Sequence, residues 1–391
     1  MAEKKRGARG AGSIRQRKDG RWEARFVVGV NPCTGKDIRK SLYASTQKEA
    51  RRKMTEAIAA LDRNDYRDPC KLTVGQWLDI WSAEYLGSVK PSTAFLYKER
   101  IRLHIKPAMS AVKLEALTPP TIQKFYNDLG KPVGDKPGLS PKTVKSIHGI
   151  LHRALQQAVA VGYIRSNPSE ACILPRVKKP ELHPFDEEQT KAFLAEVKGQ
   201  RFEVLFTVAL FTGMREGELL GLMWNRVDLD ACKIVVDKQL QLEKGTKGNY
   251  VLVPTKSDKA RTVTVAPWVM QLLRRHKAQQ AEQRLQAGPC WTNTGYVFTN
   301  GLGDHLALHT VIKDFKKAAA AIGCPEARFH DMRHSYAVAA IRSGDDIKTV
   351  QGNLGHATAA FTLDVYGHVT DQMKAASAER MEEYIRSVLN L

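Results

Sequence analysis

The segment Thr-Gly-Met-Arg-Glu-Gly-Glu-Leu at residues 212–219 decides how the second half of this chain is interpreted. Its arginine, Arg215, stands at the expected start of a helix, directly after the Thr-Gly pair. A guanidinium holds two phosphate oxygens in a planar fork, so an arginine in this place suits a phosphate site. A surface arginine beside two glutamates is the alternative, and the segment alone does not decide between them.

Other polar residues in the second half of the chain lie in similar short patterns. His330 and Arg333 are three positions apart in Phe-His-Asp-Met-Arg-His, so on a helix they share one face. His356 follows a Leu-Gly pair, and Tyr366 comes ten positions later. Lys256 lies in the turn expected between the last two strands. Each residue alone has an ordinary structural explanation, so the functional interpretation depends on the complete set.

Together with Arg215, these residues suit cleavage of a phosphodiester without a metal ion. Cleavage requires a nucleophile, stabilisation of charge on the phosphate and a proton for the leaving oxygen. Many nucleases use Mg²⁺ held by carboxylates, but the sequence contains no clustered Asp/Glu pattern of that kind. Two arginines can stabilise the phosphate instead, and a histidine beside them can activate a tyrosine, whose ordinary pKa is near 10. We therefore expect no metal and no cofactor.

The composition favours a nucleic-acid ligand inside the cell. The 391 residues include 61 Lys+Arg and 41 Asp+Glu, a net charge of +20 that suits a polyanion. The six cysteines are isolated and lack zinc spacing, as expected of thiols in a reducing cytoplasm. No apolar signal segment follows the basic N-terminus, and no stretch approaches the ~20 apolar residues of a membrane span. We expect a cytoplasmic protein, and the sequence contains no Walker loop or dinucleotide-binding glycine motif.

Residues 1–70 are typical of a small basic domain, with 18 Lys+Arg against 9 Asp+Glu. Three β-like runs, at 12–17, 22–28 and 36–42, are separated by turn residues. A helix is expected after Ser45, with apolar residues at helical spacing. The strand arginines would face outward, and a basic sheet can enter a DNA groove, although a solvated charged face is the alternative. The expected DNA-binding residues here are Arg15, Arg17, Arg25 and Arg39.

Residues 71–175 are expected to form an all-helical domain. Capping residues and first-turn prolines predict helix starts near Thr73, Pro91, Pro119 and Pro141. The apolar stripes of these helices indicate a packed core. Basic residues beside the stripes either contact phosphate or only face solvent. The expected DNA-binding residues here are Lys98, Arg100, Lys142 and Lys145.

A Pro-rich basic linker at 168–184 leads into the third region, residues 176–391, which is mostly helical. Strands are expected at 233–236, 250–253 and 262–265. The predicted fold class is mainly α and multidomain: a small three-stranded sheet with one helix, an all-α domain, and a mostly α domain with a small antiparallel sheet. An amphipathic helix is expected at the C-terminus, and the sequence does not tell whether it packs on its own domain or on a neighbouring copy.

At this order and spacing the polar set resembles the tyrosine recombinases, the family of phage and conjugative-transposon integrases. The segment at 212–219 matches the family's first arginine motif, Thr-Gly-x-Arg-x-x-Glu-Leu, and His-x-x-Arg followed by His-Ser-Tyr-Ala is similar to its second. The resemblance implies that Arg215 and Arg333 bind the phosphate and that His330 accepts or relays a proton. It carries no catalytic role over to His334, which we expect to be structural.

The resemblance also implies roles for the other three residues. Tyr366 would be the nucleophile, preferred over the other tyrosines of the region because only it follows Leu-Gly-His at the family spacing. His356 would donate a hydrogen bond to the phosphate. Lys256 would be the general acid for the leaving 5′ oxygen, and it is preferred over Lys259, three residues later.

The resemblance covers essentially the whole chain. It implies an arm-binding domain at 1–70, a core-binding domain at 71–175 and a catalytic domain at 176–391 that ends in a tail helix. It further implies site-specific recombination through a 3′-phosphotyrosine, which integrates and excises a mobile element without ATP. The implied partners are double-stranded DNA attachment sites, other copies of the chain in a homotetramer on two duplexes, and an excisionase or host DNA-bending protein, with no membrane.

Two alternatives belong to other functional classes. A type IB topoisomerase-like relaxing enzyme would use the same chemistry without exchange of partner strands, and the basic N-terminal domain argues against it. A non-catalytic DNA-binding regulator would have no use for an activated tyrosine, so the complete polar set argues against that function.

Overall fold

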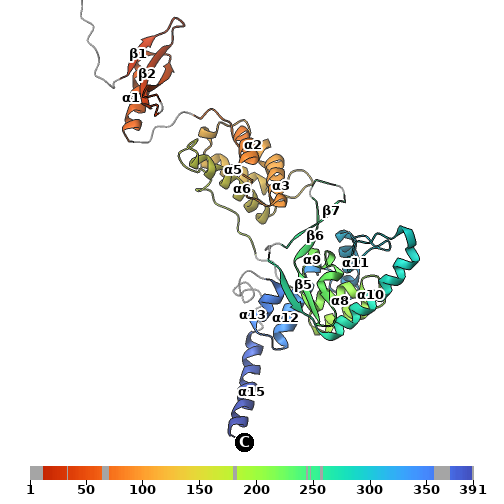
Figure 1. Ribbon diagram of the computed structural model, residues 1–391. Coiled ribbons are helices and arrows are strands. Elements are labelled where there is room, and N and C mark those ends of the chain that lie inside the picture. Colours follow the sequence, from red (N-terminus) through yellow and green to blue (C-terminus); the bar gives the residue numbers. More distant parts are fainter. Residues whose placement is uncertain are drawn as a thin grey trace, which may run out of the picture. The chain divides into compact units, whose positions relative to one another are not determined.

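The computed structural model of the chain divides into two compact units, Met1–Lys178 and Lys179–Leu391 (Figure 1). The residues that it describes are 12–32, 34–63, 70–178, 183–243, 245–246, 248–255, 259–355 and 370–389. Three predicted catalytic residues, Lys256, His356 and Tyr366, lie outside the described residues. The described part is mainly helical with small antiparallel sheets, as the sequence predicted. The boundaries of the three domains stay a prediction.

A three-stranded sheet with one covering helix forms the first part of the chain. Strands β1 (Ser13–Gln16), β2 (Trp22–Val30) and β3 (Asp37–Ala44) pair antiparallel in the order β1-β2-β3. Helix α1 (Gln47–Asp62) begins after Thr46, whose side chain caps its first turn. Alternate strand residues point to one face and pack against α1. The buried members of this cluster are Ala24, Phe26, Ala44, Ala50, Met54 and Ala57.

A helical bundle completes the first unit. Its main helices are α2 (Val74–Glu84), α3 (Pro91–Arg100), α5 (Pro119–Leu129) and α6 (Pro141–Ala160). Thr73 forms a capping box with the first turn of α2, and the other three helices carry proline in their first turn. All four predicted helix starts are confirmed.

A π-helical turn in the bundle was not predicted. It spans Ile101–Ile105 and joins α3 to the short helix α4 (Lys106–Met109). The turn shifts the following residues around the helix axis, and Ile105 is fully buried. The core is also tied by Trp77, whose Nε1 donates to the carbonyl of Ala154 at 2.8 Å and so joins α2 to α6.

Aromatic packing holds the helices of the second unit together. Its central helices are α7 (Glu187–Val197), α8 (Glu203–Thr212), α11 (Leu308–Ala321) and α12 (Phe329–Arg342). Each contributes a phenylalanine to one cluster of rings, and a fifth precedes α7. The rings are those of Phe185, Phe193, Phe206, Phe315 and Phe329. The unit also contains α9 (Glu216–Leu220) and α10 (Pro267–Ala287).

Two small antiparallel sheets lie in the second unit. One has the order β4-β5-β8, and the other pairs β6 with β7. The strands are β4 (Val227–Asp228), β5 (Lys233–Val236), β6 (Lys238–Leu242), β7 (Tyr250–Pro254) and β8 (Arg261–Thr264). The three predicted strands correspond to β5, β7 and β8, whereas β4 and β6 were not predicted.

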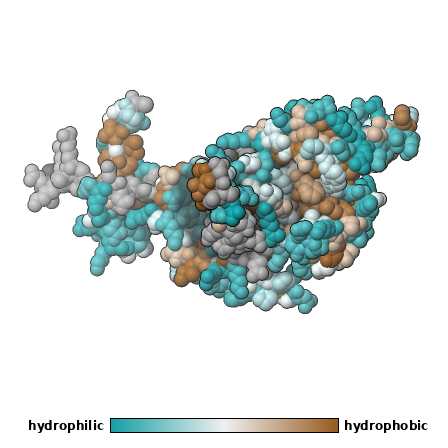
Figure 2. Space-filling model, turned by 90° about the horizontal axis from the view of Figure 1, so that it is seen from below, coloured by the Kyte–Doolittle hydropathy of each residue, from teal (hydrophilic) through white to brown (hydrophobic). Residues whose placement is uncertain are grey.

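Two helices close the described chain, α13 (Ile347–Leu354) and α15 (Thr370–Leu389). Helix α15 confirms the helix predicted at the C-terminus, and its described side chains at 381–389 are exposed. The large apolar ones are Met381, Tyr384, Ile385, Val388 and Leu389. On the face of the molecule in Figure 2, hydrophobic residues lie in patches between hydrophilic ones. None of the described helices has the length and apolar character needed to cross a membrane.

Candidate active site

The segment at 212–219 folds as a helix end, a tight turn and a new helix start. Gly213 ends α8 in the left-handed region, at φ 61°, where a side chain is strained. A Cβ at this position would lie 2.4 Å from Cδ1 of Tyr336, so close packing against α12 also requires glycine. Arg215 is the N-cap residue of α9, with extended backbone at φ −71° and ψ 152°. The predicted helix start at Arg215 is confirmed.

Glu218 is a fully buried carboxylate behind Arg215. Its Oε1 accepts hydrogen bonds from Nη1 of Arg215 at 2.7 Å and from Nη1 of Arg261 at 3.0 Å. Its Oε2 accepts from the amide of Arg215 at 2.9 Å and from Nη2 of Arg261 at 2.6 Å. Burial raises the pKa of Glu218, but the hydrogen bonds and charges of Arg261 and Arg215 outweigh it and hold the pKa at about 2. The carboxylate is ionised at neutral pH, and Arg215 is a partly buried member of a cluster rather than a surface arginine.

Arg333 reaches the same turn from the buried side of α12. The residue is 3% exposed, and its Nη1 donates to the carbonyl of Gly213 at 2.6 Å. Its Nη2 donates to the carbonyl of Leu354, the last residue of α13. Nη2 of Arg215 donates to the next carbonyl, that of Gly355, at 3.2 Å. The two arginines predicted to bind phosphate therefore converge on one helix end.

Three successive carbonyls at the end of α13 each bind a different arginine. The carbonyl of Asn353 accepts from Nε of Arg261 at 2.8 Å, and the next two accept from Arg333 and Arg215. A helix leaves its last carbonyls without intrahelical partners and carries partial negative charge at that end. The guanidinium groups donate hydrogen bonds to these carbonyls and place positive charge beside the negative end of the helix. The next residue in the sequence is His356, so two of the catalytic candidates, His356 and Tyr366, follow this arginine-bound end of α13 in the sequence.

His330 and His334 lie one turn apart on α12 with their rings in contact. The ring centroids are 5.1 Å apart and the ring planes meet at 83°. Partial burial and the charges of Arg333 and Arg215 lower the pKa of His330. Burial and the neighbouring His330 lower the pKa of His334 to about 4. The lowered pKa of His330 favours neutral imidazole, which is the state that a proton acceptor needs.

The connection from β7 to β8 contains the predicted Lys256, which lies outside the described residues. The ends of this connection are held together, because Oγ1 of buried Thr255 donates to the carbonyl of Lys259 at 3.1 Å. The side chain of Lys259 is exposed. Because β7 and β8 belong to different sheets, the connection links two sheets. The connection lies between the last two strands of the described chain, as the sequence predicted.

Two members of the cluster were not predicted as functional residues, Glu218 and Arg261. The position of Glu218 three residues after Arg215 is the spacing of a capping box, and this was the available signal. Arg261 opens β8 with its side chain 12% exposed. An arginine at a strand start is ordinary in a sequence, so only the fold reveals its place.

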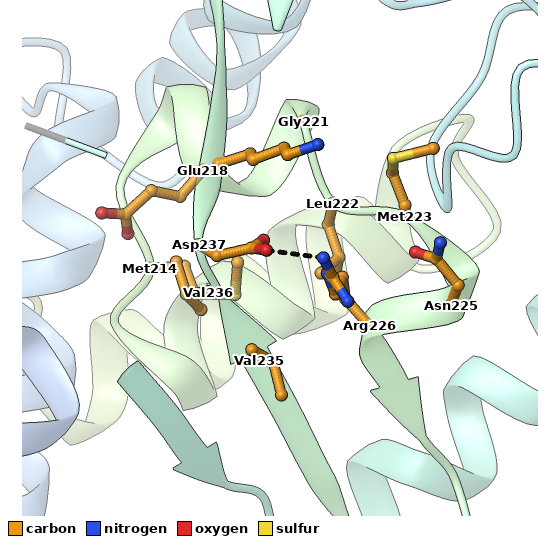
Figure 3. Close-up of a pocket in the computed structure, with 11 residues that line it drawn as sticks. Met214, Glu218, Gly221, Leu222, Met223, Asn225, Arg226, Val235, Val236 and Asp237 are labelled. Carbon is orange, nitrogen blue, oxygen red and sulfur yellow. Dashed lines mark ion pairs between the residues drawn. The ribbon is translucent and has the colours of Figure 1, made fainter. Parts of the chain in front are cut away.

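A small cavity beside the cluster is lined by Met214 and Glu218 together with residues of β5 and the turn after α9 (Figure 3). Within its lining Arg226 and Asp237 form an ion pair of 2.8 Å. None of the described catalytic candidates lines it. The cavity therefore borders the arginine cluster at Glu218 and is not part of the predicted catalytic site.

The exposed face of the N-terminal sheet collects predicted DNA-binding residues. In the strand register the face opposite α1 carries Arg15, Arg25 and Arg39. On the same face, buried Glu23 accepts hydrogen bonds from Nε of Arg15 at 2.7 Å and from Nε of Arg25 at 3.0 Å. The hydrogen bond from Arg15 lowers the pKa of Glu23 to about 2. Arg17 lies over the ring of Tyr43, 5.4 Å from its centroid. The face is therefore basic and ordered by local contacts.

The predicted DNA-binding residues of the bundle lie on two helices. Lys98 and Arg100 are in the last turn of α3, and Lys142 and Lys145 are in the first two turns of α6. The three lysines are exposed. Arg100 is half-buried, with Nη1 3.5 Å from Nε2 of His104. The lysines are open to a phosphate, whereas the guanidinium of Arg100 is partly engaged within the bundle.

Comparisons with known proteins find relatives over almost the whole chain. The profile of the phage integrase family matches residues 184–373, and that of the SAM-like N-terminal domain of phage integrases matches residues 73–130. A tyrosine recombinase XerC-like protein of Caldanaerobacter subterraneus subsp. tengcongensis is 30% identical over 385 residues, which cover 94% of this chain and 97% of that protein. The ICEBs1 integrase of Bacillus subtilis is 26% identical and covers 95% of this chain and 100% of its own length.

Solved structures support the same fold. The Tn1549 transposon integrase in complex with a circular intermediate DNA gives a TM-score of 0.66 at 20% identity. The similarity covers 80% of this chain and 100% of that chain. Most of this chain therefore has the fold of that solved structure.

Proposed function

The chain belongs to the tyrosine recombinase family, and from this premise we propose that it is a site-specific DNA recombinase that integrates and excises a mobile element. The observation that carries the proposal is the convergence of Arg215 and Arg333 on the successive carbonyls of Leu354 and Gly355. Two guanidinium groups held this close suit a single phosphate, and the residue that follows is His356.

The proposed reaction begins with attack of the Tyr366 oxygen on the scissile phosphorus. As this bond forms, the bond from phosphorus to the 5′ oxygen breaks, which gives a 3′-phosphotyrosine and a free 5′-hydroxyl. His330 accepts the phenol proton, and Lys256 donates a proton to the departing oxygen. Arg215, Arg333 and His356 donate hydrogen bonds to the phosphate oxygens, where negative charge develops.

Religation is the reverse reaction with another strand. A 5′-hydroxyl of the partner duplex attacks the phosphotyrosine, and Tyr366 leaves as the phenol. The covalent intermediate conserves the energy of the phosphodiester, so the proposed cycle uses neither ATP nor a metal. Each chain supplies one nucleophile, and exchange between two duplexes requires four cleavages. We therefore propose a homotetramer on two DNA duplexes, acting in the cytoplasm.

DNA binding is proposed for all three regions, with bounds 1–70, 71–175 and 176–391. The exposed sheet face with Arg15 and Arg25 supports an arm-type contact, and the exposed lysines on α3 and α6 support contact with the core site. An excisionase or a host DNA-bending protein would assist the assembly. The exposed apolar side chains of α15 are compatible with docking of the tail on its own domain or on another protomer.

The test is a covalent-complex assay. Supercoiled or nicked DNA with the joined ends of the element that encodes this protein is incubated with the chain in EDTA without ATP, denatured in SDS and analysed for a protein–DNA band. We expect a band for the natural sequence and none for Tyr366→Phe. The control is Tyr163→Phe, which removes a hydroxyl from the helical bundle and is expected to keep the band.

Each other outcome contradicts a specific part of the proposal. A band in Tyr366→Phe moves the nucleophile to another residue. A band that requires added Mg²⁺ overturns the metal-independent chemistry. DNA binding without a band in any variant favours the regulator, and relaxation of plasmid without exchange between two duplexes favours the topoisomerase-like enzyme.

A further inference from the structure

Arg261 is the third arginine of the cluster around Glu218 and the end of α13. It is the first residue of β8 and is mostly buried. Two of its donors bind both oxygens of Glu218, and its Nε binds the carbonyl of Asn353. It also packs against Gly355, where a Cβ would lie 3.1 Å from its Cδ. One side chain therefore joins β8, α9 and the end of α13.

The pairing of Arg261 with Glu218 affects the charge that Arg215 can present to a phosphate. Glu218 is ionised and buried, and it is shared between Arg215 and Arg261. One carboxylate between two guanidinium groups leaves one net positive charge. Without Arg261, the carboxylate would pair with Arg215 alone and cancel its charge. Because charge interactions are strong where water is excluded, such a change would weaken the field at the phosphate.

The contact with α13 adds a geometric constraint. The carbonyl that binds Arg261 directly precedes those that bind Arg333 and Arg215. Arg261 therefore holds the same helix end on which both phosphate arginines depend. A shift of this end would change the direction of both guanidinium groups.

We propose that Arg261 is a positioning residue for the reaction: it balances the charge of Glu218 so that Arg215 presents its own charge to the scissile phosphate, and it fixes the end of α13. This role rests on the proposed function, because it acts through a phosphate that Arg215 binds. In this role Arg261 acts through Arg215 and the end of α13, and not by direct contact with the phosphate or the nucleophile.

The test compares two DNA substrates that differ by one atom group. Nicked duplexes with the joined element ends carry either the natural phosphodiester or a methylphosphonate at the cleavage position. Methylphosphonate lacks the negative charge, so its cleavage depends less on a positive field. The rate of covalent complex formation is measured on both, and the ratio of the two rates does not depend on the fraction of folded protein.

We expect Arg261→Gln to slow cleavage of the phosphodiester about 100-fold, the scale of losing one oriented electrostatic donor, and cleavage of the methylphosphonate much less. Arg261→Lys keeps the charge without the fork, and it is expected to recover about tenfold of that loss. The matched control is Arg274→Gln. Arg274 also binds a carbonyl and a carboxylate, those of Leu229 and Asp230, but at an exposed site. Its removal is expected to change neither rate by more than about threefold.

A double-mutant cycle tests the charge balance directly. If Arg261 compensates Glu218, then Glu218→Gln in the Arg261→Gln background removes the uncompensated charge and restores about tenfold of phosphodiester cleavage. Equal losses on both substrates, or no restoration in the double variant, would overturn the role of Arg261 while leaving the recombinase intact. A natural chain that forms no covalent complex on the phosphodiester overturns the proposed function itself.

Discussion

His334 is a buried histidine whose neutral form is favoured in the folded chain. Burial, the neighbouring His330 and the charges of Arg328 and Arg333 lower its pKa to about 4, against an opposing effect of Asp331. The unfolded chain takes up this proton near pH 6.5, whereas the folded chain does so only near pH 4. The stabilisation is complete above pH 6.5, and about 3 kcal/mol is lost as the pH falls toward 4.

The measurement is urea unfolding of the full chain and of His334→Gln at about pH 7 and about pH 4.5. The free energy of unfolding of the natural chain is expected to fall more over this interval than that of the variant, by about 2 kcal/mol. Equal losses in the two proteins would show that His334 is not the group responsible.

At the scale of single residues, the sequence predicted those site residues whose chemical type suits a phosphate site. Arg215, His330 and Arg333 were assigned from residue type and spacing, and the fold brings them together. Glu218 and Arg261 were not assigned, because their importance comes from burial and from pairing between distant segments. A carboxylate in a sequence does not reveal whether it will be solvated or shared by two arginines.

At the scale of elements, the turn between α8 and α9 should tolerate no side chain at its glycine. Gly213→Ala combines a left-handed backbone with contacts of 2.4 Å to Tyr336 and 2.7 Å to Leu354. We expect it to lower the free energy of unfolding by about 3 kcal/mol or more. Because the carbonyl of Gly213 binds Arg333, cleavage should also slow.

Gly199→Ala is the matched control for this prediction. Gly199 also has positive φ, at 73°, but no atom lies within 4 Å of a Cβ built there. The backbone cost alone is expected, about 1 kcal/mol. Urea unfolding of both variants separates the two effects, and equal losses would contradict the steric part of the argument.

Elements with local signals were predicted, and those with non-local causes were not. Caps and prolines predicted the starts of α2, α3, α5 and α6. The π-helical turn at 101–105 places Ile105 in the core, and no local pattern in the sequence marks it. The pairing of β8 with β5 joins segments about 25 residues apart, and β6, the partner of β7, was not predicted.

At the scale of the whole molecule, we expect the basic residues behind the net charge of +20 to contribute unequally to DNA binding. Changing the three arginines of the exposed sheet face to glutamine is expected to lower the slope of log binding constant against log salt by about 3, roughly one for each phosphate that is no longer neutralised. These substitutions are Arg15→Gln, Arg25→Gln and Arg39→Gln. The measurement is a salt titration of binding to DNA with the joined element ends.

The control removes the same charge from the other side of the small domain. Lys48, Arg51 and Arg52 are exposed on α1, which covers the opposite face of the sheet. Their change to glutamine is expected to reduce the salt slope much less. Equal reductions would indicate that total charge, and not the sheet face, determines binding.

The dependence of both phosphate arginines on the end of α13 also sets an order of events on the ribosome. One of the two acceptors of the Arg215 guanidinium is the carbonyl of Gly355, 140 positions later in the chain. Domains form as they emerge during synthesis, so the basic sheet is complete long before these carbonyls exist. We therefore expect a nascent chain, or a product truncated before α13, to bind DNA through the basic sheet but not to cleave it.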